Sequence, residues 1–306
     1  MIKSFSSWFL SASLLLLVSA CLPEPDTSPD LWETISESSE YTILTEGMRR
    51  MGYDKELQAG YEFTLFAPND EGFSAWLAAR NYNSIAEVPR QDLAYLLRYH
   101  MQFGRLDIAN LGDGFIRTLC PKSPDSTGVV MLVRRSATSV ILNDTIEVIR
   151  PNTETRTGLL QELNGVVRIP RTWELIRDNP IFSTMEEAIT RAGLTGLFLG
   201  STPYTLLGVS NSAFDAYFTD NNLAGLSELT DEQVKTMVQT HIIEGNFTYE
   251  EFAQAVDNYY TNLAGTEVRI SSATAGQMII NSTIGAPIIN VQGSNGVIHV
   301  LSRPIE

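Results

Sequence analysis

The sequence repeats itself at a fixed offset, and this feature constrains the fold more than any other. Adding 141 to a residue number maps the segment from Trp32 to Gly104 onto the segment from Trp173 to Gly245 without a gap. The identical pairs include Trp32/Trp173, Glu33/Glu174, Ile35/Ile176, Glu46/Glu187, Arg50/Arg191, Gly52/Gly193, Thr64/Thr205, Leu65/Leu206, Phe73/Phe214, Ala75/Ala216, His100/His241 and Gly104/Gly245. A single register over so long a stretch predicts one folding unit that is present twice.

The register changes towards the end of each copy. Residues 164–169, Asn-Gly-Val-Val-Arg-Ile, align with residues 295–300, Asn-Gly-Val-Ile-His-Val, at an offset of 131. We therefore expect the first copy to hold about ten extra residues, in loops at 120–128 and 151–158 that are rich in turn-forming residues. In this alignment Arg168 stands where the second copy has His299.

The two copies account for most of the chain and predict two domains. A chain of 306 residues with 43% hydrophobic residues can fill two cores of ordinary size. We place the first domain at residues 31–170 and the second at residues 171–306. Because this boundary leaves almost no linker, we expect the two domains to be in close contact.

Helical patterns come first within each copy. Trp32 to Gly52 and Trp173 to Gly193 carry apolar residues at spacings of three and four and end in glycine, which predicts helices. Aromatic and aliphatic runs at 62–67 and 203–209 predict buried strands. A further amphipathic helix is expected just before each of the two repeated histidines.

Strand patterns fill the second half of each copy. They lie at 129–133, 139–142, 145–149, 268–270, 277–281, 286–291 and 297–301. Asn164-Gly165 and Asn295-Gly296 are turn pairs that favour positive φ, so we expect a tight reversal before the last strand of each copy. Helices followed by sheet predict an α+β fold.

The N-terminus has the features of a bacterial export leader. Residues 1–20 contain Lys3 and an apolar run too short to cross a bilayer, and they end in small residues before Cys21. This pattern resembles a lipoprotein signal peptide, so we expect cleavage and lipidation at Cys21; the alternative is an ordinary secretory signal that happens to contain a cysteine. Residues 21–30 are rich in proline and acid and predict a flexible tether.

The residues after Cys21 also bear on localisation. Leu22 at this position resembles lipoproteins that are sorted to the outer membrane, and the acidic tether resembles the export signals of surface lipoproteins. We therefore expect a protein that is anchored in the outer membrane by its lipid and exposed at the cell surface. The sequence leaves the periplasmic face of that membrane open as an alternative.

Three sequence blocks, each found in both copies, resemble the fasciclin domain family. The blocks are 64–73 and 205–214 for the first signature, 96–100 and 237–241 for the tyrosine-histidine block, and 164–169 and 295–300 for the closing strand. The first signature reads Thr-Leu-Phe-Ala-Pro-Asn-Asp-Glu-Gly-Phe at 64–73 and is more divergent in the second copy. Together the two copies of the pattern cover the chain from about residue 32 to residue 303.

The resemblance carries implications for both fold and function. It implies two tandem fasciclin-like domains, each a β-wedge or sandwich flanked by helices, and a role in extracellular adhesion through protein or glycan contacts. Thr240 replaces the tyrosine before His241, so a ligand contact at this block is better expected at Tyr99 and His100. The sequence leaves open whether Tyr99, His100 and His241 contact a ligand or only stabilise the fold.

Charge and motif content argue against several other functions. A formal net charge of −15 disfavours nucleic acid as a partner. The chain has three histidines and contains no nucleophile elbow, zinc-binding helix or phosphate-binding glycine loop. We therefore expect no enzyme activity, no cofactor and no metal. A hydrolase that uses His100 or His241 is the disfavoured alternative to histidines that are buried and bonded to backbone.

Several further residues leave alternatives open. Residues 69–72 and 110–114 are compatible with weak calcium binding, but plain turns fit their composition better. The pairs Tyr217-Phe218 and Tyr259-Tyr260 fit core packing and surface anchoring equally well. Cys120 has no cysteine partner once Cys21 is lipidated, so we expect it to be a small buried apolar residue.

These observations predict a non-enzymatic surface lipoprotein that binds an extracellular protein or polysaccharide. Its membrane contact is expected through the lipid on Cys21 alone. A second hypothesis is an accessory lipoprotein subunit of an outer-membrane complex for nutrient uptake, whose partner would be a transporter.

Overall fold

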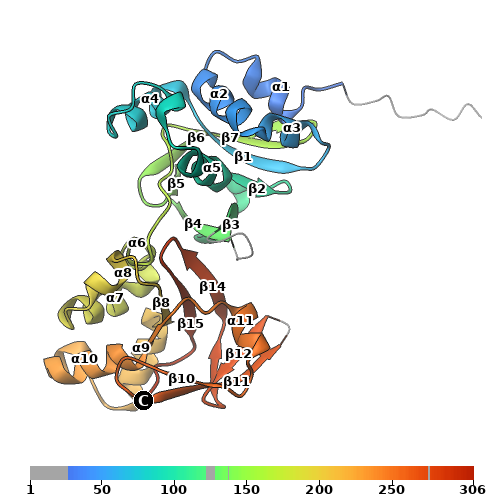
Figure 1. Cartoon of the computed structure of the whole chain (residues 1–306). Coiled ribbons are helices and arrows are strands. Elements are labelled where there is room, and N and C mark those ends of the chain that lie inside the picture. Colours follow the sequence, from blue (N-terminus) through green and yellow to red (C-terminus); the bar gives the residue numbers. More distant parts are fainter. Residues whose placement is uncertain (1–26, 122–127, 137, 275) are drawn as a thin grey trace, which may run out of the picture.

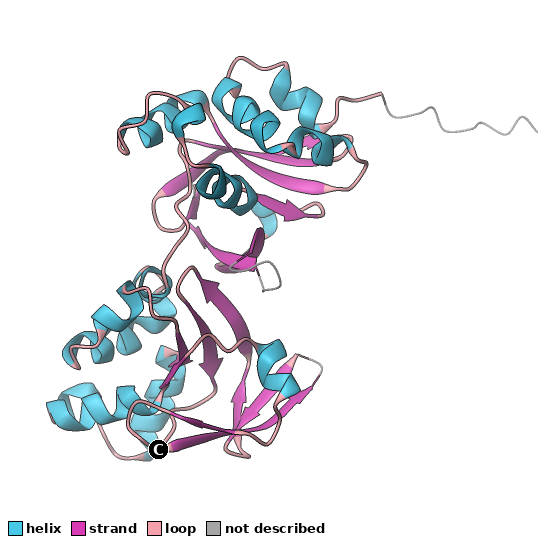
Figure 2. Ribbon diagram, viewed as in Figure 1, coloured by secondary structure: helices cyan, strands magenta, loops and turns pink. Residues whose placement is uncertain are grey.

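The computed structural model describes residues 27–121, 128–136, 138–274 and 276–306, and it divides into two domains (Figure 1). The first domain is drawn in blue to green and the second in yellow to red, and each combines helices with sheet (Figure 2). The leader, Cys21 and the tether up to residue 26 lie outside the described residues, so lipidation at Cys21 stays a prediction. None of the helices in the described ranges has the length and apolar character needed to cross a bilayer.

The first domain begins with helices and ends with sheet. Its helices are α1 (Leu31–Ser36), α2 (Thr42–Met51), α3 (Tyr53–Gln58), α4 (Asp70–Ala78) and α5 (Arg90–Tyr99), with 3-10 turns at Ile85–Glu87 and Ile108–Asn110. Its strands are β1 (Phe63–Pro68), β2 (Met101–Phe103), β3 (Gly114–Pro121), β4 (Gly128–Arg135), β5 (Val140–Leu142), β6 (Ile146–Thr155) and β7 (Gly158–Leu163). The strands form one sheet in the order β2-β1-β7-β6-β5-β4-β3. Helices α1 to α4 lie together on one side of it, and α5 packs against β3 (Figure 1).

The second domain repeats this plan. Its helices are α6 (Thr172–Arg177), α7 (Ser183–Arg191), α8 (Thr195–Leu199), α9 (Asn211–Asp220), α10 (Asp231–Thr240) and α11 (Tyr249–Gln254), with 3-10 turns at Pro180–Phe182 and Leu226–Glu228. Its strands are β8 (Tyr204–Val209), β9 (Ile242–Glu244), β10 (Tyr259–Thr261), β11 (Glu267–Thr274), β12 (Gln277–Ile280), β13 (Ile284–Ala286), β14 (Ile288–Gly293) and β15 (Gly296–Leu301). They form two sheets, β10-β11-β12-β13 and β14-β15-β8-β9. The α+β prediction is confirmed, with helices flanking sheet in both domains (Figure 2).

The second domain has two sheets where the first has one. Strand β6 is continuous from Ile146 to Thr155 and includes Pro151, whereas its counterpart in the second domain is divided into β13 and β14 on either side of Pro287.

Each predicted N-terminal helix is divided in two. The chain leaves the helical conformation between α1 and α2 and again around Pro180, between α6 and α7. The predicted glycine end is confirmed at Gly52, which closes α2 with a φ of 76°. Apolar spacing continues across each break because the helices on either side of it pack against the same hydrophobic core. Spacing alone could therefore not reveal the interruption.

Strand pairing corrects the alignment of the closing strands. Strand β7 pairs in parallel with β1, with Gly158 opposite Phe63, and β15 pairs with β8, with Gly296 opposite Tyr204. Phe63 and Tyr204 are 141 residues apart, whereas Gly158 and Gly296 are 138 apart, so the first copy holds three extra residues between these positions and not ten. The counterpart of His299 is therefore not Arg168.

The predicted turn at Asn164-Gly165 is also wrong, because this pair follows β7 instead of preceding it. Glycine is required instead at the start of β7, at Gly158, where a Cβ would lie 1.8 Å from the carbonyl oxygen of Phe63. Gly296 meets the same demand, since a Cβ there would lie 2.4 Å from the carbonyl oxygen of Tyr204. The close approach of the parallel partner, and not a turn with positive φ, fixes glycine at Gly296.

The predicted loops differ from the structure as well. Residues 151–155 belong to strand β6, whose pairing with β7 contains register shifts between Val148 and Arg150 and between Arg150 and Thr153. The second domain has the same shift between Ile288 and Val291, so the bulges are common to both copies. The offset is 141 at Gly104 and Gly245 but already 138 at Leu142 and Ile280, so the three additional residues lie between Gly104 and Leu142. At 120–128, the ends of β3 and β4 are described and residues 122–127 are outside the described ranges.

Candidate functional site

His100 ends helix α5 and is buried, with 1% of its surface exposed. Its Nδ1 donates a hydrogen bond to the carbonyl oxygen of Leu96 at 2.8 Å, and its Nε2 accepts one from the backbone N–H of Val167 at 3.0 Å. Because Val167 lies just beyond β7, the imidazole connects the end of α5 to the end of the closing strand. Both ring nitrogens are occupied by backbone groups of the protein.

His241 makes the same connection in the second domain. Its Nδ1 donates to the carbonyl oxygen of Met237 at 2.7 Å, and its Nε2 accepts from the backbone N–H of Ile305 at 2.9 Å. Val167 and Ile305 are 138 residues apart, which agrees with the register of the closing strands. The repeated histidine thus joins the same two elements in each copy.

His299 and Gln161 occupy equivalent positions in β15 and β7. The Nε2 of His299 donates to the carbonyl oxygen of Phe247 at 2.8 Å, and its Nδ1 faces the backbone N–H of Asn290 at 3.4 Å. The Nε2 of Gln161 donates to the carbonyl oxygen of Leu106 at 3.1 Å, and its Oε1 accepts from the N–H of Asn152 at 2.8 Å. Glutamine and histidine therefore satisfy the same pair of backbone groups.

Burial holds all three histidines in the neutral form. Loss of hydration lowers the pKa of His100, of His241 and of His299 to about 4, and in each case one hydrogen bond to a backbone carbonyl opposes that shift. Protonation would also place an N–H of the ring against a backbone N–H that now donates to it. At neutral pH these rings are fixed structural connections with no free nitrogen to act as a base.

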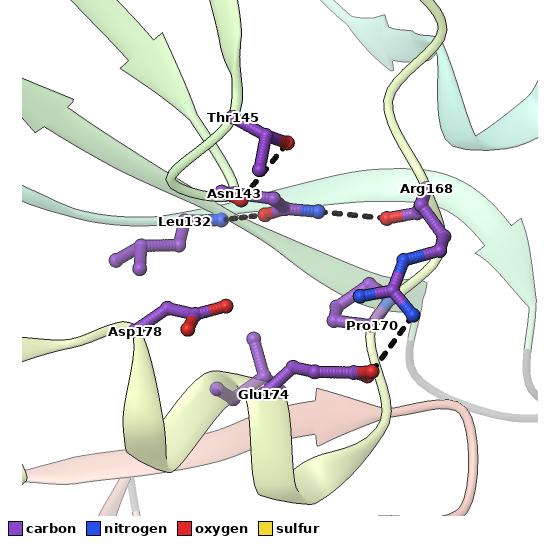
Figure 3. A pocket seen from close by; sticks show the side chains of 8 residues that line it. Leu132, Asn143, Thr145, Arg168, Pro170, Glu174 and Asp178 are labelled. Carbon is purple, nitrogen blue, oxygen red and sulfur yellow. Dashed lines mark hydrogen bonds and ion pairs between the residues drawn. The ribbon is translucent and has the colours of Figure 1, made fainter.

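Tyr99 anchors a polar network at the junction of the two domains. Its hydroxyl donates to the carbonyl oxygen of Val130 at 2.9 Å and accepts from the Nδ2 of Asn143 at 2.7 Å. The same amide of Asn143 donates to the carbonyl oxygen of Arg168 at 2.9 Å, in the segment that leads to the second domain (Figure 3). Tyr99 is fully buried, and desolvation raises the pKa of its hydroxyl well above the usual range.

Side chains from both domains close this junction. Arg168 pairs with Glu174 of α6 at 2.8 Å, and the Glu174 side chain is nearly buried (Figure 3). Val130 of the first domain belongs to the apolar cluster of the second, which includes Trp173 and Val291. The two domains are thus in direct contact through both apolar and charged side chains.

A small pocket of about 50 Å³ remains where these elements meet. It is lined by Leu132, Asn143, Thr145, Arg168, Pro170, Glu174, Leu175 and Asp178 (Figure 3). Pockets that hold small-molecule ligands are typically several hundred Å³ in volume. The junction pocket can accommodate ordered water and is too small for a ligand of metabolite size.

The structure distinguishes the remaining sequence candidates. Asn69 is the N-cap of α4 and accepts from the N–H of Gly72 at 2.9 Å, so residues 69–72 begin a helix. Phe218 is buried beside the half-buried Tyr217, and Tyr260 packs against Phe247 and Phe252. Tyr259 is exposed to 59%. Among the described residues, no group of three or more His, Cys, Asp or Glu side chains is arranged to hold a metal.

Cys120 is buried and free. Burial raises the pKa of its thiol to about 12, so the thiol stays protonated at physiological pH. Cys120 therefore lacks the thiolate character of a catalytic or redox-active cysteine.

Sequence reasoning missed Asn143 and Gln161. Asn143 has a φ of 45°, and it follows a short apolar strand and precedes Asp144, which is a recognisable turn signal. Gln161 gave no usable signal. It is equivalent to His299 in strand position and in hydrogen bonding, but the two residue types differ.

Comparison with known proteins agrees with this duplicated architecture. The fasciclin domain family matches the chain over residues 39–170 and again over residues 180–306. A solved structure with a similar fold is the FAS1 domain pair of the insect cell adhesion molecule fasciclin I, with a TM-score of 0.58 and 16% sequence identity. The similarity covers 85% of this chain and 95% of that one.

Curated relatives show similarity at low identity. The chain is 24% identical over 286 residues to transforming growth factor-beta-induced protein ig-h3 of Sus scrofa, and 22% identical over 284 residues to the protein of the same name from Oryctolagus cuniculus. These matches cover 90% of this chain and 39% of each relative, so the chain spans about two fifths of their length. The protein sll1735 of Synechocystis sp. is 24% identical over 137 residues, which cover 45% of this chain and 98% of that protein.

The two family matches, the domain pair of the same fold and the repeated histidine connections agree with one another. The chain belongs to the fasciclin domain family and carries two copies of that domain in tandem.

Proposed function

We propose that this chain is a non-enzymatic, lipid-anchored protein of the outer membrane whose fasciclin domains bind an extracellular protein or polysaccharide. The observation that supports a non-enzymatic function is that the ring nitrogens of every histidine face backbone groups of the protein. Each of the three faces backbone groups through both ring nitrogens, and each is buried and neutral. A general base needs a free nitrogen within reach of a substrate, and these rings offer none.

The binding role is supported by the architecture and by what similar proteins are named for. The FAS1 domain pair with the same fold comes from a cell adhesion molecule. The two domains are in contact through Tyr99, Asn143 and the Arg168–Glu174 ion pair, which gives the two binding units a defined relative orientation. With a fixed relative orientation, two weak contacts can act together on one extended partner.

Binding can be tested with the purified chain from residue 22 to residue 306, immobilised and exposed to matrix proteins and to a glycan array. We expect saturable binding to at least one class of ligand, and none after the chain is denatured. A folded protein that binds nothing in both panels would contradict the proposal. A stoichiometric transporter recovered from native membranes would instead favour the nutrient-uptake hypothesis.

The lipid anchor needs its own test. Cells that express the wild-type chain or the Cys21→Ser variant are labelled with an alkyne fatty acid and fractionated. We expect label and outer-membrane location for the wild type, and loss of both in the variant. Label that survives in Cys21→Ser, or a wild-type protein that carries no label, would refute lipidation at Cys21.

A further inference from the structure

An open groove of about 370 Å³ runs along helix α10 in the second domain. Its apolar lining consists of Tyr217 of α9, Leu229, Met237 of α10 and Ile305 near the chain end. Helix α10 and the chain end lie at the side of the molecule away from the first domain (Figure 1). The contact between the two domains therefore leaves this groove uncovered.

In the first domain the equivalent helix face carries aromatic rings and is covered by strand β3, against which α5 packs. Thr236 and Thr240 of α10 correspond to Tyr95 and Tyr99 of α5 at the offset of 141. Tyr99 is fully buried with its hydroxyl bonded inside the protein, and Tyr95 packs against the same apolar cluster. Two threonines in place of two tyrosines remove side-chain volume from one face of the helix. The groove is thus a specific difference between two copies of one fold.

The edge of the groove is negatively charged. The carboxylates of Glu232 and Glu306 lie at its lining, both residues are exposed, and no lysine or arginine lines it. Neither carboxylate has an ion pair or hydrogen-bond partner among the described residues. A ligand with an apolar body and a cationic end would match this arrangement in both respects.

The dimensions favour a polypeptide over a small amine. Glu232, Thr236 and Thr240 follow one another at intervals of four residues on one helix face, which makes a stripe about 12 Å long. A free alkylamine would occupy only part of this length. A neutral polysaccharide lacks the aliphatic stem, and an acidic one would be repelled by the two carboxylates.

We propose that this groove binds a lysine-bearing segment of a partner protein. The aliphatic stem of the lysine lies against Leu229 and Met237, and its ammonium group lies beside Glu232 and Glu306. This inference rests on the proposed function and specifies a protein, with a basic segment, as the partner.

The test uses the chain labelled with ¹³C at its methionine methyl groups and titrated with defined probes. The Met237 resonance is assigned by its loss in the Met237→Leu variant, and the buried Met48 and Met131 of the first domain are internal controls. The probes are hexylammonium, hexanol, hexanoate and the blocked tripeptide acetyl-Leu-Lys-Leu-amide. We expect hexylammonium to shift Met237 at lower concentration than hexanol, hexanoate to have no effect, and the tripeptide to bind at least as tightly as hexylammonium.

Variants then separate shape from charge. The Thr236→Tyr/Thr240→Tyr variant copies the first domain and should abolish the shift, and Thr236→Tyr alone, at an exposed position, tests the same point with little risk to folding. The Glu232→Gln/Glu306→Gln variant should weaken hexylammonium about fivefold or more and leave hexanol unchanged.

Equal affinities for hexanol and hexylammonium, a shift that survives Thr236→Tyr, or a tripeptide weaker than free hexylammonium would each overturn this inference. A failure here is distinguishable from failure of the proposed function. Solid-phase binding that persists in Thr236→Tyr would reject the groove and retain the surface-binding role.

Discussion

Replacement of His299 by glutamine should make the second domain less sensitive to acid. His299 and His241 both lie in the second domain, whereas His100 is the histidine of the first. All three are held neutral in the folded protein, because burial lowers the pKa of each from its ordinary value of 6.5 to about 4. Gln161 shows that glutamine can make both hydrogen bonds at the position of His299 without a titratable group.

The sign of the pH effect follows from the lowered pKa. Below pH 6.5 the unfolded chain takes up a proton on each histidine, while the folded protein does not do so until about pH 4. Stability is therefore complete above pH 6.5 and is lost as the pH falls towards 4. At pH 5 the loss is about 2 kcal/mol for each histidine, since one pKa unit corresponds to about 1.4 kcal/mol.

The two domains should differ accordingly. Between pH 7.5 and pH 5.0, the two histidines of the second domain should lower its free energy of unfolding by about 4 kcal/mol. The single histidine of the first domain should lower the free energy of unfolding of that domain by about 2 kcal/mol. In His299→Gln the loss in the second domain should shrink to about 2 kcal/mol. These amounts are a large part of the stability of an ordinary domain.

Hydrogen exchange in increasing urea, read by mass spectrometry at both pH values, resolves the two domains in one molecule. The first domain is the internal reference, because His299→Gln should leave its pH dependence unchanged. The reasoning would be refuted if the variant folded and its second domain lost as much stability on acidification as the wild type.

Three further predictions follow from single positions. Gly158→Ala should lower the free energy of unfolding, measured by urea titration, by about 3 kcal/mol or more, because its Cβ would lie 1.8 Å from the carbonyl oxygen of Phe63. The control is Gly112→Ala, whose Cβ would have nothing within 4 Å. It should change the free energy of unfolding by less than about 0.5 kcal/mol in the same titration. Equal effects of the two would contradict this argument. Asn143→Ala leaves polar groups at the domain junction unpaired and should cost about 1–3 kcal/mol, so an unchanged urea midpoint would count against the network. Cys120, with its pKa raised to about 12, should resist iodoacetamide at pH 8 until the protein unfolds, and rapid labelling of the folded chain would contradict its burial.

Residues repeated in the sequence proved to repeat their contacts. Arg50 donates to the carbonyl oxygens of Ile85 and Val88, and Arg191 does the same at Leu226 and Leu229. These contacts join segments that keep the same spacing in both copies, so identity at one offset was sufficient to predict a duplicated α+β unit. The prediction fails after the spacing changes from 141 to 138, between Gly104 and Leu142, and the alignment of the closing strands is therefore wrong.

The candidate site was only partly accessible to sequence reasoning. The position of His100 and His241 at helix ends was predicted from apolar spacing alone. Their partners Val167 and Ile305 were not, because each lies more than sixty residues away and is reached through the backbone N–H, which any residue type supplies. The groove beside Thr236 and Thr240 could be found only by comparison with the space that Tyr95 and Tyr99 fill.

The sequence by itself determined that one unit occurs twice, that each unit is α+β, and that the family is fasciclin-like, because these properties depend on residue types at local spacings. Only the tertiary structure decided which glycine faces the parallel partner strand and which residue is equivalent to His299. Both depend on the pairing of strands that are about ninety residues apart, such as β1 with β7. A short Asn-Gly motif cannot report that pairing, because the constraint comes from the approach of another backbone and not from the motif itself.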